Sequence, residues 1–262
     1  FGFKTLARSL PRSAPRSSAA TARAAAADQS SGDLFADLSA TPVAEEAQQR
    51  HVSYDTILNW ADFDRWLARL QAAPLVALDT ETTALDPLRA TLVGLSFSVQ
   101  PGEAAYLPLA HTYPDAPAQL PLAEVLDRLR PWLESDAHRK LGQNLKYDAH
   151  ILANHGIALA GIAEDTLLES YVLESDKSHD MDSLASRHLG LKTLTYTEVC
   201  GKGAKQIGFG EVDLARATEY AAEDADITLR LHHALQARLA QTPSVQPVLT
   251  DIEMPLVPVL AR

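Results

Sequence analysis

Two carboxylates stand one residue apart at the end of an apolar run. Residues 75–78 (LVAL) are suited to a strand buried on both faces, and Asp79 and Glu81 follow directly. Because side chains alternate along a strand, both carboxylates lie on the same side of it. Like charges this close repel, so a buried pair requires a cation, and divalent metal ions prefer oxygen ligands of this kind. The spacing therefore predicts a metal site whose other ligands lie elsewhere in the chain.

Two further acidic residues and a tyrosine occur in segments of helical character. Asp148 lies in QNLKYDAHIL, in the first turns of an expected helix, and Asp224 lies in EYAAEDADITLRLH, in a longer one. Tyr220 precedes Asp224 by four residues, so the two side chains share a helical face on which the phenol can orient a water. A two-metal phosphodiester hydrolase needs about four carboxylates around two cations roughly 3.5–4 Å apart.

Each of these signals is common when it is taken alone. The alternative for Asp79 and Glu81 is a solvated strand end, and the alternative for Asp148 and Asp224 is an exposed helix acid. Their order, spacing and context together favour the metal site.

The elements that must position these residues can be read from hydrophobic periodicity and from breakers such as Pro74 and Gly156. Strands are expected at residues 75–80, 91–99, 104–109 and 140–144. Helices are expected at residues 58–72, 121–133, 145–154, 165–173, 180–188 and 213–240. The first three strands follow one another through short connections, which predicts an antiparallel meander. The order of elements predicts a mixed α/β fold with helices packed on a central sheet.

Composition narrows the class of protein. The chain of 262 residues carries a formal net charge of -11, which argues against a non-specific nucleic-acid coat but not against an enzyme that handles nucleic acid through bound metal. The single cysteine, Cys200, excludes a disulfide within the chain and a thiolate metal site. The sequence contains no apolar run of 18 residues, so no transmembrane helix is expected.

The ends of the chain differ from its middle. Residues 1–49 are rich in Ala, Ser, Arg and Pro and are expected to be a disordered linker. A mitochondrial presequence is the alternative, but the chain starts at Phe1 without a methionine, which fits an internal position better. Residues 50–241 are expected to fold as one domain, and residues 242–262 to begin another that is cut short.

The segments LVALDTETTALD, LGQNLKYDAHIL and YAAEDADITLRLH resemble the three motifs of the DEDD superfamily of 3'→5' exonucleases. The tyrosine form of the third motif is similar to the DEDDy branch, and most similar to the proofreading domains of bacterial DNA polymerases I. The resemblance covers residues 52–239 and includes HDMDSLASRHLG and GKGAKQ. It implies a ribonuclease H-like mixed sheet, with an antiparallel meander plus parallel strands, flanked by helices. It also implies that residues 1–49 follow a 5'-nuclease domain and that IEMPLVPVL opens a polymerase domain.

The resemblance assigns roles to individual residues. It implies two divalent metal ions, Mg²⁺, Mn²⁺ or Zn²⁺, with Asp79 bridging both and Glu81 and Asp224 completing the site of the ion that binds the attacking water. Asp148 would support the second ion through water, and Tyr220 would position the nucleophile.

Substrate contacts are also implied. Leu85 would be an apolar wedge against the terminal base, Tyr196 an aromatic stacker, and Asn144 a further contact to the 3'-terminal nucleotides. Lys202 or Lys205, in the glycine-rich loop GKGAKQ, is expected to contact the substrate backbone, and the alternative is plain solvated loop lysines.

The function implied is a 3'→5' exodeoxyribonuclease that removes 5'-mononucleotides from single-stranded or frayed DNA 3' ends. The expected setting is a monomer in the bacterial cytoplasm, associated with the nucleoid, with a polymerase domain in cis and no membrane contact. One alternative is a ribonuclease D-like RNA exonuclease, which shares the same motifs. Another is a catalytically silent scaffold of a polymerase, against which the intact acids argue.

Overall fold

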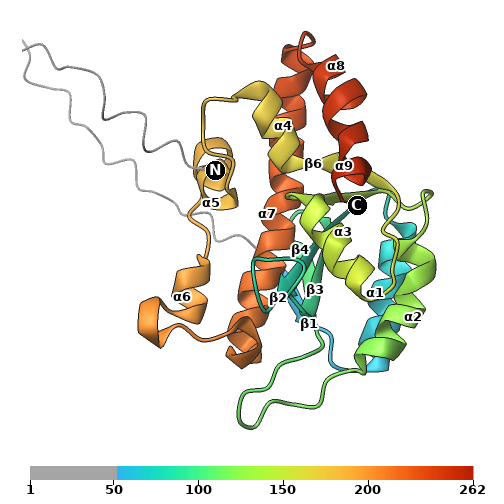
Figure 1. Cartoon of the computed structure of the whole chain (residues 1–262), viewed down its shortest axis with the longest axis vertical. Helices are drawn as coiled ribbons and strands as arrows, with labels where there is room; N and C mark the ends of the chain where they lie inside the picture. Colours follow the sequence, from blue (N-terminus) through green and yellow to red (C-terminus); the bar gives the residue numbers. More distant parts are fainter. Residues whose placement is uncertain (1–51, 262) are drawn as a thin grey trace, which may run out of the picture. The chain divides into compact units, whose positions relative to one another are not determined.

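A computed structural model of the chain describes residues 52–261, so the expected linker at residues 1–49 lies outside the described residues. The described part is built on one mixed sheet with helices on both faces (Figure 1). Its strands are β1 (Ser53–Thr56), β2 (Val76–Thr82), β3 (Leu92–Gln100), β4 (Glu103–Pro108), β5 (Lys140–Gly142) and β6 (Ile162–Asp165). They lie in the order β1-β4-β3-β2-β5-β6.

The topology confirms the meander and adds two strands. Strands β2, β3 and β4 pair antiparallel in succession, while β5 pairs parallel to β2. The strands β1 and β6, at the two edges of the sheet, were not predicted, and β1 pairs parallel to β4 and β6 parallel to β5. Each is four residues long and only partly buried, so it lacks the apolar run that reveals a strand in a sequence.

The two faces of the sheet carry different helices. Helices α1 (Trp60–Ala72), α2 (Leu122–Leu133) and α3 (Leu145–Asn154) share a core with the face to which Leu78 points, and α7 (Leu214–Gln241) crosses the other face. On β2, Ala77 packs against Leu229 of α7. Because side chains alternate, Asp79 and Glu81 also face α7, whereas Thr80 faces α3.

The remaining helices are short. They are α4 (Thr166–Leu173), α5 (Met181–Leu184), α6 (Tyr196–Cys200), α8 (Gln246–Val248) and α9 (Met254–Leu260). The helix predicted at residues 180–188 is instead α5 followed by a π-helical turn, η2 (Ala185–Leu189), and it ends at Gly190 in the left-handed conformation. Leu249, just after α8, and Val257 of α9 pack against Leu168 and Leu239. That residues 242–262 begin a separate domain stays a prediction.

Among residues 52–261 the structure contains no helix with the length and apolar character needed to cross a bilayer.

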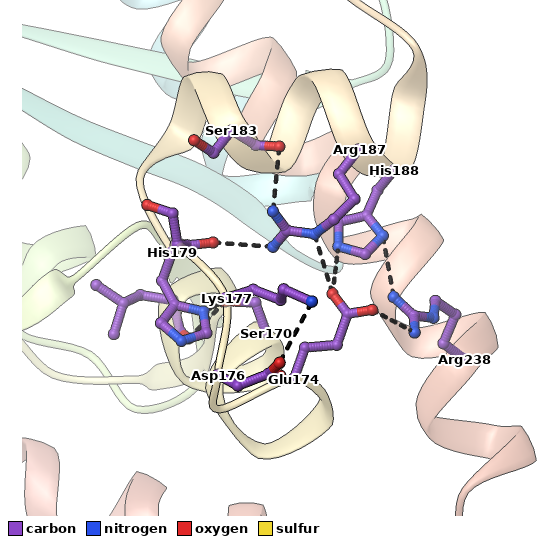
Figure 2. Close-up of polar contacts among 11 residues, drawn as sticks. Ser170, Glu174, Asp176, Lys177, His179, Ser183, Arg187, His188 and Arg238 are labelled. Carbon is purple, nitrogen blue, oxygen red and sulfur yellow. Dashed lines mark hydrogen bonds and ion pairs between the residues drawn. The ribbon is translucent and has the colours of Figure 1, made fainter. Parts of the chain in front are cut away.

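A charge cluster joins the end of α4 to η2 and α7 (Figure 2). Glu174, at the end of α4, accepts hydrogen bonds from Arg187 Nε of η2 at 3.0 Å and from Arg238 Nη2 of α7 at 2.8 Å. His188 Nε2 lies 3.5 Å from the same carboxylate. The hydrogen bond from Arg238, the largest cause, and that from Arg187 hold the pKa of Glu174 below its ordinary value.

Replacing Glu174 by alanine is expected to lower the free energy of unfolding at pH 7 by about 2 kcal/mol, because two charge-assisted hydrogen bonds are lost. A carboxyl whose pKa is lowered by folding stabilises the fold above its unfolded value of 4.5 and loses that contribution as the pH falls through the folded value. The difference between wild type and variant should therefore shrink at pH 3. Urea unfolding at both pH values measures it.

Glu219→Ala is the matched control, because Glu219 is an exposed acid that pairs with Arg216, one turn away on the same helix. Its effect should stay within about 0.5 kcal/mol. Equal losses in the two variants at pH 7 would contradict the structural role of the cluster.

Candidate active site

A cleft of about 630 Å³ opens where β5 ends and α3 begins. Eight of the ten residues that the sequence singled out line it: Asp79, Glu81, Leu85, Asn144, Asp148, Tyr196, Tyr220 and Asp224. They come from β2, the loop after it, α3, α6 and α7. The structure therefore brings together residues that lie up to 145 positions apart in the sequence, from Asp79 to Asp224.

Three of the carboxylates form a compact group. One ligand oxygen from each of Asp79, Glu81 and Asp224 lies within 4.8 Å of the others. β2 is an interior strand of the sheet, and its pairing with β3 shifts register between Glu81 and Thr82, a bulge that ends the regular ladder at the cleft. The contact face of α7 carries small side chains, so this helix packs closely enough for Asp224 to reach the carboxylates of β2 (buried: Ala217, Ala221, Ala222, Ala225).

The fourth carboxylate reaches the cleft from the opposite face of the sheet. Asp148, on the first turns of α3, is buried and accepts a hydrogen bond from Thr80 Oγ1 at 2.7 Å. It lies outside the three-carboxylate group, as a ligand acting through water would. Asp165 holds the start of α3, because its carboxylate accepts from the backbone N–H groups of Asn144 at 3.0 Å and Leu145 at 2.9 Å.

Asn144 has an unusual backbone conformation. Its φ of 71° and ψ of 49° are left-handed, a region that asparagine tolerates better than most residues. The turn between β5 and α3 depends on this conformation, and the residue lines the cleft. Backbone strain of this kind gathers at functional sites, where the surrounding structure holds it in place.

Burial raises the pKa of all four carboxyl groups, and repulsion raises it further in three of them. Burial raises the pKa of Asp79 to about 7. For Glu81, Asp148 and Asp224, burial is again the largest cause, and the charge of Asp79 raises each pKa further. In the part of the chain that the structure describes, none of the ion pairs involves any of the four. The cleft therefore gathers four acidic groups with no side-chain cation among the described residues to balance their charge when they ionise.

This donor set fits a divalent metal ion. Glu81 Oε1 is buried and makes no hydrogen bond, which is costly unless a ligand completes it. Hard oxygen donors converging from β2 and α7 are the ligands that Mg²⁺ and Mn²⁺ prefer.

Tyr220 lies beside Asp224 on the wall formed by α7. Burial, followed by the charge of Asp224, raises the pKa of its phenol well above the ordinary value. The group therefore stays protonated at neutral pH and can donate a hydrogen bond, but it cannot act as a base. Its ring packs on Phe209 at 5.7 Å and lies 6.4 Å from Tyr196, centroid to centroid.

The mouth of the cleft carries exposed apolar groups. Leu85 is 95% exposed on the loop after β2, and Tyr196 is 37% exposed at the start of α6. Tyr147 fixes the loop, because its hydroxyl donates to the carbonyl of Ala84 at 2.6 Å and also contacts Thr82 Oγ1. A large exposed leucine on a fixed turn is suited to contact with a flat base.

Sequence reasoning did not single out every residue of the cleft. Tyr147, Gln143, Gln206 and Thr82 also line it. Tyr147 adjoins Asp148 in the same motif, so its position was the one available signal. Lys202 and Lys205 are exposed and do not line the cleft, although Gln206 of the same loop does. Contact of these lysines with substrate stays a prediction.

A second group of metal-type side chains lies away from the cleft, in Glu164, Glu169 and His232. Each of the three already has a polar partner, although Glu169 Oε2 has none. His232 Nδ1 lies 2.7 Å from Glu169 Oε1, the Gln236 amide contacts both carboxylates, and Arg139 pairs with Glu164. We assign this cluster to the packing of α4 on α7.

Comparison with known proteins agrees with the resemblance of the sequence motifs to exonucleases. A family described as 3'-5' exonuclease matches residues 54–240. DNA polymerase I of Pseudomonas aeruginosa is 54% identical over 222 residues, which is 84% of this chain and 24% of that protein. DNA polymerase I of Rhizobium leguminosarum is 41% identical over 230 residues, covering 81% and 22%. The chain thus spans about a quarter of the length of these relatives.

Solved structures agree in fold. The Pol1 structure from M. smegmatis with DNA primer-template and dNTP superposes with a TM-score of 0.60 at 21% identity, covering 79% of this chain and 31% of that one. Brucella melitensis NrnC superposes with a TM-score of 0.56 at 20% identity, covering 79% and 89%. The expected ribonuclease H-like sheet flanked by helices is confirmed. Since the family match extends over nearly all of the described sheet and its helices, the chain belongs to the 3'-5' exonuclease family.

Proposed function

We propose that this chain removes nucleotides one at a time from DNA 3' ends, as the proofreading part of a DNA polymerase I. The observation that carries the proposal is the convergence of Asp79, Glu81 and Asp224 beside Tyr220, with one oxygen of Glu81 buried and unpartnered. The identity of 54% to a bacterial DNA polymerase I supports DNA as the substrate.

The geometry supports an assignment of the metal ligands. Asp79, Glu81 and Asp224 would hold the ions directly, and Asp148, which stands outside that group, would act through water. Two bound divalent cations, Mg²⁺, Mn²⁺ or Zn²⁺, would supply the positive charge that makes a water acidic enough to attack phosphorus and that stabilises the leaving 3'-oxygen.

The other residues act by placing the reactants. Tyr220 would donate its phenol proton to orient the attacking water, since its raised pKa keeps it protonated. The water oxygen bonds to phosphorus as the bond to the 3'-oxygen of the preceding nucleotide breaks. The products are a nucleoside 5'-monophosphate and a strand that again ends in a 3'-hydroxyl.

Substrate binding would use the mouth of the cleft. Leu85 would wedge against the terminal base, Tyr196 would stack on a base, and Asn144 would contact the terminal nucleotide. Lys202 or Lys205 would touch the backbone farther from the scissile bond. We place the protein as a monomer in the bacterial cytoplasm at the nucleoid, with residues 1–49 as a linker and a polymerase domain following in cis.

Metal removal tests the proposal. With Mg²⁺, 5'-labelled single-stranded DNA should shorten stepwise from its 3' end. With excess EDTA the rate should fall to background, and it should recover when Mg²⁺ is restored, because the four carboxylates then regain their counter-charge.

RNA of the same sequence is the matched substrate and should be degraded more slowly. Faster trimming of RNA would favour the ribonuclease D-like alternative. Intact DNA in the presence of Mg²⁺ and Mn²⁺, while a control exonuclease digests it, would favour the silent scaffold.

A further inference from the structure

The buried phenol of Tyr106 lies on the same face of the sheet as Glu81, and its hydrogen bond goes to His111. Glu81 on β2 pairs with Gly94 on β3, so side chains at these two positions point to the same face. A Cβ at Gly94 would lie 2.3 Å from Tyr106 Oη, so the hydroxyl of Tyr106 fills the space that Gly94 leaves open. Directly opposed Cβ positions are about 5 Å apart, which puts this hydroxyl within reach of the Glu81 side chain.

The register of the sheet independently places the Tyr106 side chain on the face that carries the carboxylates of β2. Asp79 pairs with Ser96, and Ser96 pairs with Tyr106, so Asp79 and Tyr106 point to the face that α7 covers. Tyr106 is fully buried. Burial, and after it the charge of Glu81, raises the pKa of its phenol, so the hydroxyl keeps its proton.

The direction of that proton follows from the neighbouring histidine. His111 Nδ1 lies 3.0 Å from the carbonyl oxygen of Val212, which can only accept, so Nδ1 carries a hydrogen. Burial lowers the pKa of His111, which keeps the ring neutral, and its Nε2 is then an acceptor. Tyr106 Oη, at 2.8 Å from Nε2, therefore donates to His111.

His111 is itself held in place. Its backbone N–H donates to Gln119 Oε1 at 2.8 Å, and its carbonyl accepts from Gln119 Nε2 at 2.9 Å. The imidazole packs at 5.8 Å from the ring of Phe209, which also supports Tyr220. The acceptor for the Tyr106 proton is thus fixed by contacts outside the cleft.

We propose that His111 is a positioning residue that draws the Tyr106 proton away from Glu81 and so keeps that carboxylate open to a metal ion. Glu81 Oε1 makes no hydrogen bond although the Tyr106 hydroxyl is within reach on the same face, and the Tyr106–His111 bond accounts for this. Without His111, the buried hydroxyl of Tyr106 would lose its acceptor, and the Glu81 carboxylate on the same face of the sheet would take its place. That bond would compete with the cation. The inference rests on the proposed metal-dependent function.

A double-mutant cycle in the whole chain tests it. His111→Leu should raise the Mn²⁺ concentration for half-saturation, measured by titration calorimetry, about tenfold. In that variant Mn²⁺ must first break the hydrogen bond from Tyr106 to the charged Glu81 carboxylate. Tyr106→Phe keeps the ring over Gly94 and removes the hydroxyl. This variant should bind Mn²⁺ within about twofold of wild type. The double variant should also return to within about threefold of wild type, because no hydroxyl is left to occupy Glu81.

Three outcomes would overturn the inference. The first is a His111→Leu variant that binds Mn²⁺ like wild type, and the second is a double variant as weak as His111→Leu, which would mark a purely structural role. The third is a wild type that binds no Mn²⁺. Circular dichroism and the thermal midpoint identify any variant that fails to fold, and His111→Gln, which restores an acceptor, should then be tested and should bind near the wild-type value. Wild type that binds Mn²⁺ but leaves DNA intact would defeat the proposed function alone.

Discussion

Replacing Asp224 by alanine is expected to lower the rate of DNA 3'-end degradation by about three orders of magnitude, or about 4 kcal/mol of transition-state stabilisation. Asp224 is one of three carboxylates whose ligand oxygens lie within 4.8 Å of one another, and it comes from α7, whereas the other two come from β2. Its removal leaves the three-carboxylate group without its only metal-ligand oxygen from α7. Single-turnover digestion of 5'-labelled single-stranded DNA measures the loss.

Glu219→Ala provides the control for this experiment. Glu219 lies on the same helix, is exposed, and does not line the cleft. Its rate should stay within about twofold of wild type, because exposed charges outside the site contribute little. A similar loss in both variants would point to the helix and not to the site, and a rate for Asp224→Ala near wild type would defeat the catalytic assignment.

Replacing Trp132 by alanine should lower the free energy of unfolding by about 4 kcal/mol, the largest stability effect we expect from one side chain. The indole is 1% exposed, lies edge-on to Phe97 at 6.0 Å, and donates from Nε1 to the carbonyl of Leu70 at 3.1 Å. Its removal opens a cavity and leaves that carbonyl without its donor. The ammonium of Lys140, 4.9 Å from the ring, would lose a contact as well.

Urea unfolding at pH 7 measures the change, and Trp60→Ala is the comparison. Trp60 is only partly buried, at the start of α1, so its neighbours can close around a smaller gap. Equal losses in the two variants would mean that α2 does not anchor the core as the structure indicates.

The site could be predicted because short-range spacing encodes its geometry. A separation of two on a strand puts Asp79 and Glu81 on one face, and a separation of four on a helix does the same for Tyr220 and Asp224. Both relations hold in the structure, where these four side chains and Asp148 line one cleft. The meander was predictable for a similar reason, since its connections are short.

The parts that escaped prediction depend on contacts between distant residues. The edge strands β1 and β6 are strands only because β4 and β5 supply their hydrogen bonds. The bond between Tyr106 and His111 affects Glu81 only because Gly94 lies opposite Glu81 in the sheet. The sequence does not show this register. The glycine-rich loop turns Gln206 toward the cleft and leaves Lys202 and Lys205 outside its lining, which composition alone does not determine.

The buried and unpartnered oxygen of Glu81 has an evolutionary consequence. In the absence of metal, four crowded acids in one cleft weaken the fold, so replacing any of them with a neutral side chain of similar size would relieve it. If stability alone were selected, substitutions would therefore accumulate that leave the fold intact and the site inactive. The four acids together are thus a set that stability alone would not favour.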